Sequence, residues 1–371
     1  MEEKRGWTNV VESRKEREMG REQISIVIPV YGAEKYLKEL LDKLLRQEDP
    51  EVEILCIDDG SVDKSQEICR AYAQAHPCIR YYRKENRGVS HTRNFGIQKA
   101  RGTWICFVDS DDYLEKGAIA RLRPYLGQET DALYFNYHRG EKDRELTGRV
   151  GDFEAKEILR ATLDQTAGQS EIRECFTLQS ASLAISCAKL YRLDVIRKNG
   201  IQFPEQLRIG EDVCFNLQYL GRSRKVRTLD EALYYYRKTP GSTTQTYSGQ
   251  HFLEEEKLIR QMAGYREEAA EFTKELRIYL LGVLLHINTN LGKLPARRHR
   301  IREYRKLLRD ADIRWILEKT EKKEALSPGK YQNLYYHLAV RLLQKNRIHL
   351  AVCLGDLYRN LQKFFRNRDG K

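Results

Sequence analysis

Short apolar runs alternate with amphipathic segments through the first third of this chain, and this alternation limits the fold more than any other feature. Residues 24–30 read ISIVIPV, a nearly continuous apolar run of the kind found in strands that are covered on both faces. Three further apolar runs predict strands at 52–57, 79–82 and 104–108. The segments between the strands have helical spacing and predict helices at 34–46, 64–75 and 89–99. Helices that link successive strands predict a mostly parallel sheet with right-handed crossovers.

The strand predicted at 104–108 ends in a cluster of carboxylates. Asp109, Asp111 and Asp112 follow it directly, with Ser110 between them. Carboxylates this close repel one another, so they need water or a cation, and Mg²⁺ and Mn²⁺ take oxygen ligands. In open α/β sheets the ligand crevice lies beyond the carboxyl ends of the strands, where these residues would sit. The other interpretation is an acidic turn that caps the next helix, and these residues alone leave both open.

Several classes of protein are disfavoured by what the sequence lacks. The first strand is followed by neither GxGxxG nor GxxxxGK[ST], which weighs against a dinucleotide oxidoreductase and a P-loop enzyme. The eight cysteines contain no CxxC pair, which favours buried thiols in a reducing compartment. Charges dominate the first 22 residues, and the clearest apolar run, 278–285, is too short to span a bilayer. We therefore expect a cytoplasmic protein that at most lies on the inner face of a membrane.

The later part of the chain changes in pattern and in charge. Beyond residue 108 we expect these elements: helices at 117–126, 153–163, from 193, after 212, and at 252–262, 267–291, 298–308, 331–344 and 350–365, and strands at 131–137 and 232–237. The formal charge is +12, but residues 293–371 hold 21 Lys or Arg against 8 Asp or Glu, which leaves about −1 (12 − 13) for the first 292. A basic helical tail suits an anionic partner such as a membrane surface. Nucleic acid is disfavoured, because the basic residues lack interleaved aromatic side chains.

This pattern predicts three parts. A charged, disordered N-terminal extension covers residues 1–22, within which Met19 is a second candidate for the native start. An α/β domain covers 23–250, and a basic helical C-terminal region covers 251–371.

Five separated stretches in a fixed order connect the α/β domain to a known family. They are SIVIPVYGAEKYL (25–37), IDDGSVD (57–63), ENRGVSHTRNFGIQKARG (85–102), FVDSDDYL (107–114) and GEDVCFN (210–216). Each is weak alone, but the ordered set resembles the inverting glycosyltransferases of family 2 over roughly residues 24–245. The resemblance implies the GT-A fold, a Rossmann-like and mostly parallel α/β domain, here followed by a helical C-terminal region.

The resemblance also implies a site for a nucleoside diphosphate sugar. The residues that would line the base and ribose follow the first strand: Pro29, Val30 and Tyr31. Asp58 or Asp59 would accept a hydrogen bond from the base or a ribose hydroxyl; the alternative is a plain turn with a helix N-cap. Arg93 falls in the family's NxGxSxARNxG pattern, with Thr92 where Ala is usual. It would contact the diphosphate, or else form an ion pair with the acidic cluster.

Two acidic motifs would carry the chemistry that the resemblance implies. Asp111 would bind Mn²⁺ or Mg²⁺ directly, and Asp109 would bind it through water or face the ribose, so that the metal neutralises charge on the leaving diphosphate. Asp212 would be the base that takes the acceptor proton, with Glu211 orienting it or the acceptor. The alternative for this pair is a helix N-terminus that favours negative charge.

A loop over the diphosphate would include Tyr236 and Arg237, beside Ser242. Many relatives have a metal-binding His in this region, and its absence here puts a third protein ligand in doubt. The QxxRW motif of processive synthases is also absent, which favours transfer of a single sugar. The predicted activity is metal-dependent, inverting transfer of one sugar from a nucleoside diphosphate sugar, with a UDP-sugar as the favoured donor. The acceptor would be a cell-surface glycan, an exopolysaccharide unit or another glycan, which can be linked to a lipid. The alternative is a catalytically inactive relative that binds a nucleotide sugar or a partner protein.

Overall fold

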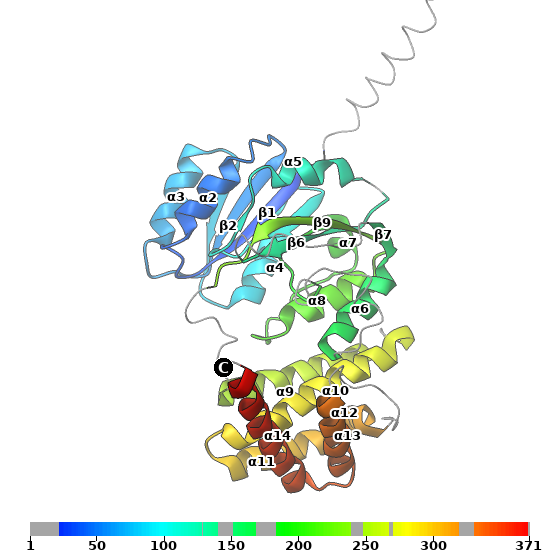
Figure 1. The fold of residues 1–371 in the computed structure, drawn as a ribbon. Helices are drawn as coiled ribbons and strands as arrows, with labels where there is room; N and C mark the ends of the chain where they lie inside the picture. The colour runs from blue at the N-terminus through cyan, green and yellow to red at the C-terminus, as the bar shows by residue number, and fades with distance from the viewer. Residues whose placement is uncertain are drawn as a thin grey trace, which may run out of the picture.

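A computed structural model describes residues 22–127, 129–139, 151–167, 183–238, 248–266, 270–318 and 330–369. It consists of a sheet with helices on both faces and a helical region packed below (Figure 1). Two sequence predictions concern residues outside these ranges: nearly all of the N-terminal extension, and Ser242 in the loop after residue 238.

The sheet has nine strands in the order β3-β2-β1-β4-β8-β6-β9-β5, with β7 paired to β9. The strands are β1 (Ile24–Val30), β2 (Val52–Asp58), β3 (Ile79–Arg83), β4 (Trp104–Phe107), β5 (Tyr113–Leu114), β6 (Ala132–His138), β7 (Gly151–Glu154), β8 (Lys189–Arg192) and β9 (Lys225–Tyr235). β1 to β4, β6 and β9 run in one direction, and β5, β7 and β8 run against them. The predicted mostly parallel sheet is therefore confirmed.

Two hydrophobic cores cover the two faces of the sheet. One face carries α2 (Leu37–Leu45), α3 (Ser65–Ala75) and α5 (Ala118–Leu122); the other carries α4 (Val89–Lys99), α6 (Ala155–Ala167), α7 (Leu193–Lys198) and α8 (Glu211–Leu220). β1 serves both cores, because Ile26 and Ile28 face α2 while Val27 faces α4. At Gly96 a Cβ would lie 2.3 Å from a Val27 methyl carbon, so glycine lets α4 lie this close to β1.

The helical region is built around α10 (Thr273–Asn290), which contains the apolar run at 278–285. The other helices are α9 (Gly249–Ala263), α11 (Arg297–Arg309), α12 (Ala311–Glu318), α13 (Lys330–Gln344) and α14 (Ile348–Asp369). α10 packs on α6, so one continuous core joins the sheet domain to the helical region. Among the described residues, no helix is both long and apolar enough to cross a bilayer.

The structure corrects three details of the sequence prediction. Residues 151–154 form β7, so the helix expected from 153 starts only at Ala155. β9 starts at Lys225, earlier than the run expected at 232–237. The sequence did not indicate this start, because charged residues in the first half of the strand hide its apolar alternation. α12 was not expected, because it is short and follows α11 after the single residue Asp310.

Candidate active site

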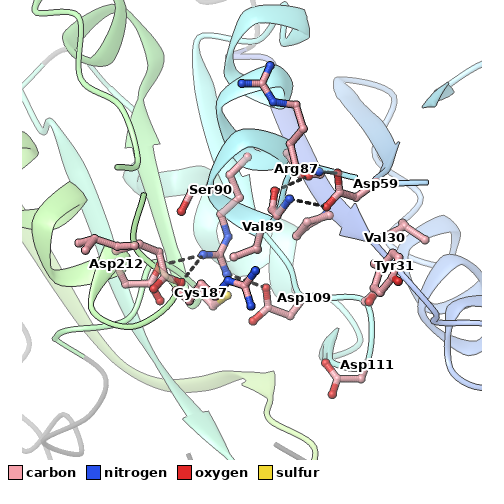
Figure 2. Close-up of a pocket in the computed structure, with 18 of the residues that line it drawn as sticks. Val30, Tyr31, Asp59, Arg87, Val89, Ser90, Asp109, Asp111, Cys187 and Asp212 are labelled. Carbon is pink, nitrogen blue, oxygen red and sulfur yellow. Dashed lines mark hydrogen bonds and ion pairs between the residues drawn. The ribbon is translucent and has the colours of Figure 1, made fainter. Parts of the chain in front are cut away.

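A cavity of about 930 Å³ opens beyond the carboxyl ends of β1 and β4, between the first turns of α4 and α8 (Figure 2). Its wall brings together these residues singled out from the sequence: Pro29, Val30, Tyr31, Asp59, Arg93, Asp109, Asp111, Asp112, Glu211, Asp212, Tyr236 and Arg237. Asp111 and Asp212, 101 positions apart in the chain, thus face one space.

The acidic cluster after β4 is held by the end of β9. Asp112 is buried and accepts hydrogen bonds from the Tyr234 hydroxyl at 2.6 Å and the Arg237 backbone N–H at 2.8 Å. Burial and the negative charge of Asp109 raise the pKa of Asp112 to about 8. The sequence left Asp112 as a possible helix cap, but α5 begins after Gly117, and Asp112 instead ties the turn to β9.

The carboxylates of this turn fit a divalent cation that a substrate helps to hold. Among the described residues, no group of three or more His, Cys, Asp or Glu side chains is arranged as a complete metal site. Mg²⁺ usually takes only one or two carboxylates and completes its shell with phosphate oxygens and water. Asp109 and Asp111 both line the cavity beside Asp112, so three carboxyl groups lie within four consecutive residues. A cation would reduce the repulsion among them.

The second acidic pair owes its position to a glycine. Gly210 precedes α8 with φ of +80°, and a Cβ there would lie 2.7 Å from the Leu258 side chain of α9. Glu211 and Asp212 therefore occupy the first turn of α8, where backbone N–H groups favour negative charge. Burial and the charge of Asp212 raise the pKa of Glu211 to about 7.

Arg93 joins the two acidic clusters. Its guanidinium, 4% exposed, lies 2.9 Å from Asp109, 3.2 Å from Glu211 and 3.0 Å from Asp212. Burial acts against the charge, but these carboxylates outweigh it and keep the pKa of Arg93 above its usual value. The ion pair with the acidic clusters is therefore present, and the contact of Arg93 with a diphosphate stays a prediction.

The two aspartates after β2 differ in position. Asp59 lines the cavity and accepts hydrogen bonds from the backbone N–H groups of Arg87 at 2.9 Å and Gly88 at 2.8 Å, and from the Lys84 ammonium. It thereby holds the loop that leads into α4. Asp58 is fully buried, accepts from the Tyr81 hydroxyl at 2.9 Å, and does not line the cavity. Of the two, only Asp59 lines the cavity, and its contact with a nucleotide stays a prediction.

Arg237 is fastened at the rim of the cavity by several groups. Its Nε donates to the Asp111 carbonyl at 2.8 Å, and one terminal nitrogen donates to Glu39 at 2.8 Å. The guanidinium also lies over the Tyr36 ring, 4.8 Å from its centroid. Arg237 thus fixes the backbone of the turn that carries the candidate metal ligands, a role that the sequence did not predict.

A buried network that the sequence did not reveal shapes the opposite wall, where Ile185 and Cys187 line the cavity. The Asn216 amide donates to the carbonyls of residues 184 and 185, at 2.9 and 3.1 Å, and the Lys189 ammonium donates to the carbonyls of residues 185 and 187. Tyr191 donates to the Asn216 side-chain oxygen at 2.7 Å. Asn216 ends the GEDVCFN stretch, but its partners lie some 30 residues away, so spacing gave no signal.

Comparisons with known proteins match this chain to one family. The sequence model described as "Glycosyl transferase family 2" matches residues 25–200. The uncharacterized glycosyltransferase EpsJ of Bacillus subtilis (strain 168) is 34% identical over 60% of this chain and 63% of EpsJ, so less than two thirds of that protein is matched. The putative glycosyltransferase EpsH of the same strain is 30% identical over 70% of this chain and 74% of EpsH.

Among solved structures, residues 1–349 of Staphylococcus aureus TarS in complex with UDP-GlcNAc are similar with a TM-score of 0.65. The identity is 20%, and the match covers 91% of this chain and 92% of that one. This likeness supports the GT-A fold followed by a helical region.

Proposed function

This chain belongs to glycosyltransferase family 2, and on that premise we propose that it transfers a single sugar from a nucleoside diphosphate sugar to an acceptor hydroxyl. The transfer would take place during synthesis of a cell-surface polysaccharide or another glycan. The observation that carries the proposal is that Asp111 and Asp212 face one cavity and that Arg93 links their two clusters. We propose a UDP-sugar as donor, because TarS, whose fold this chain shares, was solved with UDP and with UDP-GlcNAc.

The proposed mechanism is a single displacement with inversion. Asp212 takes the proton of the acceptor hydroxyl. Arg93, which Glu211 also pairs with, fixes the orientation of the Asp212 carboxylate. The residues after β1 and Asp59 border the space for the base and ribose. Mn²⁺ or Mg²⁺, when held by Asp111 and Asp109, would supply positive charge to the departing diphosphate.

The acceptor belongs to the proposal as a class only. It carries a free hydroxyl on a glycan or a lipid-linked glycan. The proposal also includes a cytoplasmic location and contact of the protein with the inner face of the membrane. Two of the relatives are named for poly(ribitol-phosphate) glycosyl transfer, which supports a cell-surface polymer as the kind of acceptor.

A thermal-shift series with release assays tests the proposal. UDP-, GDP- and ADP-sugars are added with and without Mn²⁺, and we expect one class to raise the melting temperature, because a ligand that binds only the folded state stabilises it. The same donor should release its nucleoside diphosphate slowly in water and faster with acceptor glycans. If no donor shifts the melting temperature under either condition, the proposal is wrong. Binding without release would favour the catalytically inactive relative.

A further inference from the structure

The outer faces of α13 and α14 expose leucines that a folded domain normally covers. Leu334 and Leu338 on α13 are 59% and 41% exposed, and Leu350, Leu357 and Leu361 on α14 are 57%, 56% and 47% exposed. Only three other large hydrophobic side chains in the described part of the chain are exposed: Tyr31 and Val62 in loops, and Leu253 on α9. Both helices belong to the helical region below the sheet domain, and the C-terminal end of α14 lies on the side of that region nearest the sheet domain (Figure 1).

The leucines follow helical spacing and are not scattered. On α14, Leu350, Leu357 and Leu361 continue through the half-buried Leu354 at intervals of four, three and four residues. They lie opposite Ile348 and the other buried residues of this helix, which pack in the core. α13 shows the same arrangement, with Leu334 and Leu338 opposite a buried side. Each helix is therefore apolar on two sides, and the described residues cover only one of them.

Basic residues continue the leucine row of α13 and line the neighbouring helix α11. On α13 the row of Leu334 and Leu338 continues into Arg341 and Lys345, both exposed. α11 packs against α14 and contains seven Lys or Arg against one Glu. The outward row of α11 consists of exposed basic residues: Arg298, Arg302, Lys306 and Arg309. We name the outer faces of α11, α13 and α14 the leucine–arginine face.

We propose that the leucine–arginine face docks on an anionic lipid bilayer. Leucines beside arginines are the composition of helices that lie in the membrane interface, where apolar side chains enter the acyl boundary and cations meet lipid phosphates. A second copy of the chain fits less well, because a two-fold contact would bring together two regions with a surplus of 13 positive charges each. Nucleic acid would use the arginines but leave the leucines in water.

Docking extends the proposed function, because it would hold the cavity near acceptors that are anchored in lipid. It does not depend on sugar transfer, however, so it is measured without donor. A failure of docking then leaves the transferase proposal standing, and a failure of transfer leaves docking standing.

Flotation of the full-length protein with vesicles tests the proposal. We expect binding to phosphatidylcholine vesicles that contain phosphatidylglycerol, weaker binding in high salt, and little binding to phosphatidylcholine alone. The double variant Leu350→Ser/Leu357→Ser should lower the affinity by about tenfold or more. Arg298→Ala and Arg302→Ala should each lower it by about fivefold. Leu253→Ser, at an exposed leucine of α9 outside the face, is the matched control and should bind as the unaltered protein does.

Sedimentation and melting curves of the same variants separate the other occupants. Equal melting temperatures show that the leucine variants are folded. If the unaltered protein ignores anionic vesicles but forms a dimer that Leu350→Ser/Leu357→Ser dissociates, the face binds a second copy and the docking proposal is overturned. Retention of an oligonucleotide at physiological salt, without vesicle binding, would overturn it in favour of nucleic acid.

Discussion

The two acidic clusters of the cavity share one arginine but are built in different ways. Asp109 and Asp111 lie on a turn after β4, and the Asp109 side chain is 34% exposed. Glu211 and Asp212 lie on the first turn of a helix, with side chains 13% and 22% exposed. A turn can adjust its carboxylates around a cation that arrives with its substrate, whereas a helix start holds a proton acceptor in one place.

Arg93 makes the two clusters depend on each other. It contacts Asp109 with one terminal nitrogen and both Glu211 and Asp212 with the other. Its charge is balanced by carboxylates from two separate elements, so a change at either cluster alters the field at the other. The following variants ask whether the strand-end cluster serves the metal and the helix-start cluster serves the proton, as this division of roles requires.

The largest effect is expected from Asp212→Asn. The amide keeps the size of the side chain but cannot take a proton, and loss of a general base costs roughly 10²- to 10⁴-fold in rate. UDP binding, measured by thermal shift in Mn²⁺, should change far less than kcat, because Asp212 reaches the strand-end cluster only through Arg93. A variant that keeps more than a tenth of kcat would remove Asp212 from the role of base.

Asp111→Asn should have the next largest effect and a different signature. Weaker cation binding should lower transfer by roughly a hundredfold, and extra Mn²⁺ should restore part of it. The rise in melting temperature that UDP causes in Mn²⁺ should also be smaller for Asp111→Asn than for Asp212→Asn. Ser110→Ala, at a neighbouring cavity residue without a carboxylate, is the control. If Asp111→Asn and Asp212→Asn give the same Mn²⁺ titration, the two clusters do not have separate roles.

Arg93→Lys tests the link between the clusters and should have a smaller effect. Lysine keeps the charge but lacks the planar fork that reaches both clusters at once, so we expect about a tenfold loss of kcat. Arg87→Lys, at an exposed arginine of the cavity rim, is the matched control and should change kcat little. A loss confined to the melting temperature, with kcat unchanged, would show that Arg93 only stabilises the fold.

The fold was predictable where the signals are local. The apolar run of β1 and the leucines of α2 lie within about twenty residues and show their periods directly. The family resemblance added the order of the motifs. The structure brings the predicted site residues to one cavity at the sheet edge, except Asp58, whose side chain is buried in the interior.

The details of the site were less predictable, because they depend on contacts between distant segments. Arg93 meets partners 16, 118 and 119 positions away, so the sequence left its role open between a phosphate contact and an ion pair. Asn216 holds the cavity wall through backbone carbonyls 31 and 32 positions away, which any residue can supply. The exposed leucines of α14 resemble core leucines in sequence, because a helical period cannot tell an inner face from an outer one.

The smallest expected effect is a pH dependence of the melting temperature that is due to Glu211. Its pKa of about 7 in the folded protein exceeds the ordinary value of 4.5, so the folded state binds the proton more tightly. Glu211 therefore lowers stability most above pH 7, and this penalty shrinks as the pH falls from 7 towards 4.5. Glu211→Gln, which resembles the protonated acid, should melt at a higher temperature than the unaltered protein at pH 8 and at a similar temperature near pH 5. A difference that stays constant between these pH values would show that Glu211 does not titrate there.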